Sequence, residues 1–241
     1  LYDILETEYD EGLIEKNLPL SKILRKYKFP KTIIKTEAYS VSEVKKMLEE
    51  STGWFSVYLE LALKYGLRPS EMILIKWGDL DLYNGLLSIK RSWSDKKVVE
   101  ATELTETNKN HLRDFYLFPE TIEKLKAYFK VRPHNEWLFI SKYNTHFKTL
   151  DSLRNSHMGN LLRKLKIEYK GLYAARRSYN SIMTQSKQIK KSDIQNVMGH
   201  ATGSKIGDEH YNLDCLAIEN KKAIALRQAK VFNEMLQEAS D

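Results

Sequence analysis

The chain has 241 residues, of which 42% are hydrophobic and 29% are charged, a composition typical of a globular protein rather than a disordered one. Its 39 lysines and arginines exceed its 32 aspartates and glutamates, and the resulting net charge of +7 favours a polyanionic partner. A single cysteine, Cys215, excludes an intrachain disulfide and a thiolate metal cage, and the apolar stretches are too short to span a membrane.

The first 35 residues differ in character from the rest. The spacing of apolar residues predicts a helix over about residues 1–20, and a basic stretch of weak periodicity follows it. Lys28 and Lys31 in this stretch are candidates for contact with an anionic partner, and a solvated linker is the alternative. Because the chain begins at Leu1 and not at a methionine, we expect it to be a fragment.

Three helices are predicted next. Ser40 followed by Glu43 has the spacing of a capping box, so the first of these helices begins there. The second, over about residues 54–65, is densely apolar and therefore expected to be buried. A glycine ends it, and Pro69 opens the third helix.

The middle of the chain predicts a small antiparallel sheet. Asn84-Gly85 is a strong signal for a tight turn, and β-prone runs follow it. The expected strands are 86–89, 98–99, 112–118 and 137–140, with a polar hairpin tip at 102–110.

The remaining segments are predicted to be helical. They cover about residues 119–129, 150–165, 173–183, 192–198 and 213–236. The expected fold class is therefore mainly α with a small antiparallel β-sheet, and the principal domain begins at about residue 36.

Four short stretches carry the candidate chemistry. Arg68 lies in the string Gly-Leu-Arg-Pro-Ser-Glu, Arg176 follows Tyr173 by three positions, His200 follows a glycine, and Tyr211 comes eleven positions after His200. In this order and at these separations, the stretches resemble the tyrosine recombinase, or phage integrase, family.

That resemblance implies a tyrosine-recombinase-like catalytic domain over residues 36–241, with residues 1–35 as the end of a core-binding domain helix plus a basic linker. The C-terminal helix, about residues 213–238, is expected either to dock on a neighbouring protomer or to complete the core of its own chain.

The implied activity is site-specific recombination of double-stranded DNA, for the integration or excision of a mobile element. It would proceed through a 3′-phosphotyrosyl intermediate, without a metal, ATP or any other cofactor. The implied assembly is a homotetramer on DNA, with accessory DNA-bending proteins. The implied location is the cytoplasm of a prokaryotic cell, associated with the nucleoid and not with a membrane.

The residue types fit this chemistry. Two guanidiniums, from Arg68 and Arg176, can stabilise the charge that builds up on a phosphate under attack, because both stay ionised and offer paired donors. His200 would add a further donor, and Tyr211 would be the nucleophile. The alternatives are surface arginines, a structural histidine and a packed aromatic ring.

Two positions depart from the family pattern. Tyr173 stands where the family usually has a histidine, and a tyrosine is a much weaker base, so His210 is a candidate to share the role. The family's general acid is a lysine of the sheet hairpin. Lys109 is the first candidate for that acid, and Lys96 and Lys97 are the next.

Arg177, directly after Arg176, points about 100° away on a helix and is a candidate for a neighbouring DNA phosphate. Two other functions stay open. One is a nicking and closing enzyme resembling type IB topoisomerases, and the other is a DNA-binding relative with weak or no catalysis.

Overall fold

The computed structural model describes residues 37–94, 97–100, 113–132, 134–199 and 218–239. Contacts divide the chain into Leu1–Lys35 and Thr36–Asp241, and all described residues belong to the second unit. The helix and basic linker expected over residues 1–35 lie outside the described residues, as does the hairpin tip at 102–110. The domain assignment thus stays a prediction.

The first described helices form as their sequence signals predict. Helix α3, Val41–Glu50, begins at the capping box in which Ser40 and Glu43 exchange side-chain to backbone hydrogen bonds. Helix α4, Gly53–Lys64, is buried along nearly its whole length. The helix ends just before Gly66, whose positive φ of 61° and close approach to the Tyr179 ring suit only glycine.

The strands form two small antiparallel sheets. The first orders β1 (Leu80–Asp81), β2 (Leu86–Ile89) and β5 (Arg113–Tyr116), and the second pairs β3 (Arg91–Ser94) with β4 (Lys97–Glu100). The turn at Asn84-Gly85 joins β1 to β2 as predicted, with Gly85 at a φ of 72°.

The prediction of a strand at 137–140 is wrong, because these residues do not join a sheet. Only an isolated bridge joins Trp137 to Lys76, because α5, Pro69–Met72, ends early and the chain after it runs past residues 136–138. Hydrogen bonds from Trp77 N to Glu136 O and from Leu138 N to Ile75 O complete that crossing. The apolar run Leu138–Phe139 is buried in the core instead of extending a sheet.

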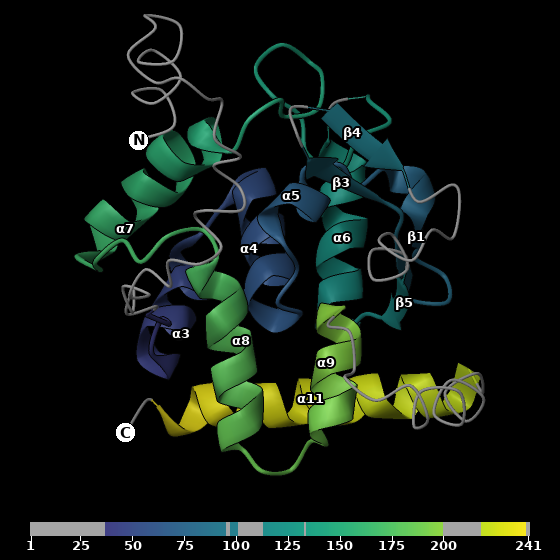
Figure 1. Ribbon diagram of the computed structural model, residues 1–241, viewed down its shortest axis with the longest axis vertical. Coiled ribbons are helices and arrows are strands. Elements are labelled where there is room, and N and C mark those ends of the chain that lie inside the picture. The colour runs from purple at the N-terminus through teal and green to yellow at the C-terminus, as the bar shows by residue number, and fades with distance from the viewer. Residues whose placement is uncertain (1–36, 95–96, 101–112, 133, 200–217, 240–241) are drawn as a thin grey trace, which may run out of the picture. The chain divides into compact units, whose positions relative to one another are not determined.

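The other helices enclose the core. They are α6 (Pro119–Val131), a π-helical segment (Leu153–Met158) continuing into α7 (Gly159–Leu165), α8 (Ala174–Gln185), α9 (Lys191–Met198) and α11 (Ile218–Glu238). The expected fold class, mainly α with a small antiparallel sheet, is confirmed (Figure 1).

Helix α11 packs on its own chain. It contacts α3, α8 and β5, and Figure 1 shows it crossing α8. Ala225, Ala229, Val231 and Phe232 of this helix are buried, whereas Leu226 is exposed. The apolar face of α11 is thus covered within one chain, and docking on a neighbouring protomer stays a prediction.

Candidate active site

Arg68 is placed at the junction between α4 and α5. It caps α5, and the Glu71 side chain accepts hydrogen bonds from the Arg68 backbone N (3.2 Å) and from Arg68 Nη1 (2.8 Å). Arg68 Nη2 donates to the carbonyl oxygen of Gly199 at 3.0 Å. One guanidinium therefore connects the start of α5 to the end of α9, although 131 positions separate these residues.

Arg176 lies in the first turn of α8 and is only 6% exposed. Its Nη1 donates to Gly66 O at 2.6 Å and its Nη2 to Met198 O at 2.7 Å. Burial, together with the positive charges of Arg68 and Arg113, lowers the pKa of Arg176 to about 10. Arg176 is therefore still a cation at neutral pH, in a place where positive charge is disfavoured.

Glu71 is the buried carboxylate beside these side chains, and it is 1% exposed. It pairs with Arg68, and its charge also acts on Arg176. Arg113 of β5 binds it through two hydrogen bonds, Nη1 to Oε1 at 3.0 Å and Nη2 to Oε2 at 2.7 Å. Burial raises the pKa of Glu71, but the bonds and charges of Arg113 and Arg68 outweigh it and lower the pKa overall. Glu71 is therefore ionised at neutral pH.

The C-terminus of α9 completes the arrangement. The last three carbonyl oxygens, of Val197, Met198 and Gly199, each accept a hydrogen bond from a different arginine. Gly199 has a left-handed conformation, with a φ of 66°, and ends the helix. The three guanidiniums thereby fix the direction in which the chain leaves α9.

We call Arg68, Arg113 and Arg176, gathered around Glu71, the arginine cluster. Among the described residues, three positive charges face one negative charge, and the partial negative charge at the end of a helix offsets only about half a unit more. Burial makes such a surplus costly unless an anion binds there. Paired planar donors suit the oxygens of a phosphate.

Arg113 and Glu71 were not among the candidate site residues. A signal for Arg113 was present, because residues 113, 115 and 117 share one face of a strand and the two apolar members, Phe115 and Leu117, are buried. An arginine on that inward face indicates a buried acidic partner, because an unpaired buried charge is costly.

Tyr173 and Arg177 lie on either side of Arg176 in sequence. Tyr173 precedes α8 and is 46% exposed, so its ring is accessible from solvent. Arg177 donates from Nε to Glu37 O at 2.6 Å and from Nη2 to Lys170 O at 3.0 Å. Tyr39 N likewise donates to Ser178 Oγ at 2.8 Å. These bonds tie the start of the described chain to α8, and a phosphate contact by Arg177 stays a prediction.

The other candidates lie outside the described residues. They are Lys28, Lys31, Lys96, Lys109, His200, His210 and Tyr211, and for Lys97 only the backbone, in β4, is described. Of the expected anion-binding residues, the structure brings Arg68 and Arg176 together. His200 directly follows the Gly199 carbonyl that Arg68 binds.

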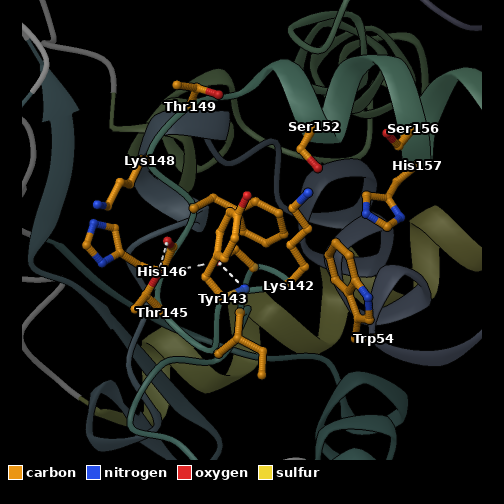
Figure 2. Close-up of a pocket in the computed structure, with 13 residues that line it drawn as sticks. Trp54, Lys142, Tyr143, Thr145, His146, Lys148, Thr149, Ser152, Ser156 and His157 are labelled. Carbon is orange, nitrogen blue, oxygen red and sulfur yellow. Dashed lines mark hydrogen bonds between the residues drawn. The ribbon is translucent and has the colours of Figure 1, made fainter.

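A separate cavity of about 700 Å³ lies beside the π-helical segment. Figure 2 shows Trp54 and His157 side by side on one wall and Tyr143 within it, and the Trp54 and His157 rings are 4.6 Å apart. None of its lining residues belongs to the arginine cluster. The part of the chain that the structure describes contains no group of three histidine, cysteine or acidic side chains placed to hold a metal. No helix within the described ranges is both long and apolar enough to cross a bilayer.

The known proteins that match this sequence are integrases. Residues 38–214 match the sequence profile of the phage integrase family. The chain is 24% identical over 147 residues to the prophage integrase IntR of Escherichia coli strain K12, an alignment that covers 61% of this chain and 34% of IntR. It thus spans about a third of the length of that curated relative.

Solved structures share the fold. XerA recombinase has a TM-score of 0.55 at 17% identity, with 89% of this chain and 67% of XerA covered. The Tn1549 transposon integrase in complex with transposon right end DNA has a TM-score of 0.56 at 15% identity, covering 85% and 73%. A lambda integrase dimer bound to a COC' core site has a TM-score of 0.52 at 17% identity, covering 89% and 57%.

Proposed function

Because this chain belongs to the phage integrase family, we propose that it is a site-specific DNA recombinase that cuts and rejoins double-stranded DNA through Tyr211. The Tyr211 oxygen bonds to the phosphorus of the scissile phosphate as the bond from phosphorus to the 5′ oxygen breaks. The products are a 3′-phosphotyrosyl link and a free 5′ hydroxyl. Attack by that hydroxyl reverses the step and rejoins a strand, so no metal or ATP is consumed.

The observation that carries this proposal is the charge surplus of the arginine cluster. Attack on a phosphodiester places additional negative charge on the two non-bridging oxygens, and preorganised cations stabilise that charge more in a dry site than in water. Arg68 has the more accessible guanidinium, at 22% side-chain exposure, and Arg176 is buried, at 6%. His200 is proposed as a third donor, because it follows the end of α9 directly.

Proton handling is proposed to rest on other residues. Lys109 would donate a proton to the leaving 5′ oxygen, with Lys96 and Lys97 as the alternatives. Tyr173, exposed at the start of α8, is proposed as a hydrogen-bond donor to the phosphate. We expect this site to bind phosphate well and to deprotonate its nucleophile slowly.

The partner is proposed to be double-stranded DNA carrying a specific recombination site. The names of the matched Tn1549 and lambda integrase structures describe integrases bound to DNA, and the net charge of +7 favours the same kind of partner. A tetramer that spans two duplexes, accessory bending proteins and a location at the nucleoid complete the proposal.

Covalent trapping tests it. A DNA sequence that binds the protein is first selected from a randomised pool of duplexes. That sequence is then made as a set of duplexes, each with a single nick at a different position. Cleavage next to the nick releases a short strand, so the reaction cannot be reversed. We expect a protein–DNA adduct that survives denaturant with the wild-type chain, and none with Tyr211→Phe. Binding of the same duplexes by both proteins is the control.

Other outcomes would separate the alternatives. Tight binding without an adduct on any nicked duplex would contradict the proposal and leave a DNA-binding relative. An adduct with relaxation of supercoiled DNA, but without joined products from two duplexes, would indicate a nicking and closing enzyme. An adduct that persists in Tyr211→Phe would exclude Tyr211 as the nucleophile.

A further inference from the structure

Arg113 joins three elements that are far apart in the sequence. Its guanidinium binds the buried Glu71 carboxylate of α5 through two hydrogen bonds, at 3.0 and 2.7 Å. Its Nε donates to Val197 O in the last turn of α9 at 2.9 Å. Every nitrogen of this guanidinium therefore has a partner within the protein, and the side chain is only 9% exposed.

The stem of Arg113 also packs against the end of α9. A Cβ added to Gly199 would lie 2.8 Å from Arg113 Nη1, 2.9 Å from Cζ and 3.0 Å from Cδ, closer than such contacts normally come. Gly199 also has a φ of 66°, which disfavours other residues. The conformation that ends α9 is thus shaped by the backbone of Gly199 and by the side chain of Arg113 together.

Arg113 also limits how far the Glu71 carboxylate compensates the positive charge of Arg68. Glu71 Oε1 is shared between Arg68 Nη1 at 2.8 Å and Arg113 Nη1 at 3.0 Å, whereas Oε2 binds Arg113 Nη2 at 2.7 Å. Without Arg113, both oxygens would be available to Arg68, and a bidentate pair would neutralise its guanidinium. Arg113 thereby keeps positive charge available for an incoming phosphate.

We propose that Arg113 is a positioning residue for strand cleavage, which acts through Glu71 and through the end of α9 and does not touch DNA. It holds the last carbonyls of α9, and so sets where the chain toward His200 begins. It also holds Glu71 in the orientation that leaves Arg68 donors free to face the phosphate. This inference rests on the proposed function, because it concerns the same reaction.

The planar fork of the guanidinium is essential to this role. A lysine at position 113 supplies the charge but cannot reach two carboxylate oxygens and a carbonyl at once. A methionine keeps most of the stem and removes all donors. The two variants therefore separate the contribution of charge from that of geometry.

Arg91 offers a matched control. It is also a strand arginine bound to a buried carboxylate, with Arg91 Nη1 2.6 Å from Asp79 Oδ2 and side-chain exposures of 13% and 3%. Asp79 belongs to the short helical turn Trp77–Asp79 and not to α9, so Arg91→Met should affect folding to a similar degree and leave the end of α9 in place.

The experiment measures two quantities on nicked duplex DNA. We expect Arg113→Met to lower the rate of adduct formation at saturating DNA by about 10- to 100-fold, as misplacement of reacting groups does, while the dissociation constant for DNA changes by less than about 3-fold. Arg113→Lys should recover only part of the rate, and Arg91→Met should retain it. Melting temperatures identify conditions in which all four proteins are folded.

A measurement without DNA keeps this inference separate from the proposed function. Hydrogen exchange of a peptide covering residues 191–199 should be faster in Arg113→Met than in the wild-type chain, and unchanged in Arg91→Met. Equal exchange in all three, or a full cleavage rate in Arg113→Met, would overturn the positioning role. Faster exchange with no adduct even in the wild-type chain would instead contradict the proposed function.

Discussion

Two clusters of charged side chains in the same domain differ in their balance of positive and negative charge. The first, here the α4–α6 cluster, joins α4, α6 and α11 through Glu60, Lys64, Glu120, Thr121, Lys124 and Asn233. Its two carboxylates face two ammonium groups. In the arginine cluster, two guanidiniums bind one carboxylate, and the charge of that carboxylate also acts on a third guanidinium, of Arg176.

This difference separates a structural role from a binding role. In the α4–α6 cluster, Lys64 lies 2.7 Å from Glu60 and 3.2 Å from Glu120, and Lys124 binds the other oxygen of Glu60. These charges are satisfied within the protein and hold helices together. Among the described residues, the arginine cluster retains positive charge after its internal bonds are made, as the proposed binding of a phosphate requires.

The largest expected effect concerns cleavage. Arg68→Lys keeps a positive charge but loses the paired donors, so the rate of adduct formation should fall by about 100- to 1,000-fold, the cost of removing one oriented donor to a transition state. The rate is measured in single turnover on the nicked duplex, below the melting temperature of the variant.

Lys64→Met in the α4–α6 cluster is the matched comparison. It leaves Glu60 and Glu120 without their shared ammonium group and should reduce the free energy of unfolding by about 2 kcal/mol. Its cleavage rate should remain close to that of the wild-type chain. If Arg68→Lys and Lys64→Met lowered the cleavage rate equally, the two clusters would not differ in their roles in binding and in structure.

A smaller effect should appear with inorganic phosphate alone. At a phosphate concentration of about ten times the dissociation constant, binding adds about 1.4 kcal/mol of stability, or roughly 4 °C in melting temperature. Lys64→Met should keep this increase and Arg68→Ala should lose most of it. Sodium chloride at equal ionic strength is the control, and a similar increase in Arg68→Ala would place the phosphate elsewhere.

The smallest effect is the dependence of stability on pH. The pKa of Glu71 is lower in the fold than its ordinary value of 4.5, so its carboxylate stabilises the fold at neutral pH. That contribution is lost as the pH falls through the lowered pKa. The difference in unfolding free energy between the wild-type chain and Glu71→Gln, measured in urea, should therefore shrink below about pH 4.5. A constant difference from neutral to acidic pH would contradict an ionised Glu71.

The sequence predicted most of the helices, because the residues that start, fill and end a helix lie within a few positions of one another. The capping box at Ser40, the apolar run of α4 and the proline at the start of α6 each determine structure within a few residues. The strand expected at 137–140 failed for the opposite reason. Its apolar residues fill the core, and a short apolar run has the same appearance whether a sheet or a core receives it.

The candidate site was predicted in part. Motif spacing identified Arg68 and Arg176, which the fold brings together at the end of α9. Arg113 was missed because its partners lie 42 and 84 positions away, and no local pattern encodes such distances. The alternation of residues along β5 indicates which side chains face inward, but it does not indicate that Glu71 is the carboxylate that Arg113 binds.

The bonds from α8 to the entering chain have a mechanical consequence. Arg177 donates to the carbonyl of Glu37 and Ser178 accepts from the backbone N of Tyr39, so the two residues of α8 that follow the buried Arg176 hold the segment 37–39. A pull on residues 37–39 is therefore applied to the helix one residue from the site.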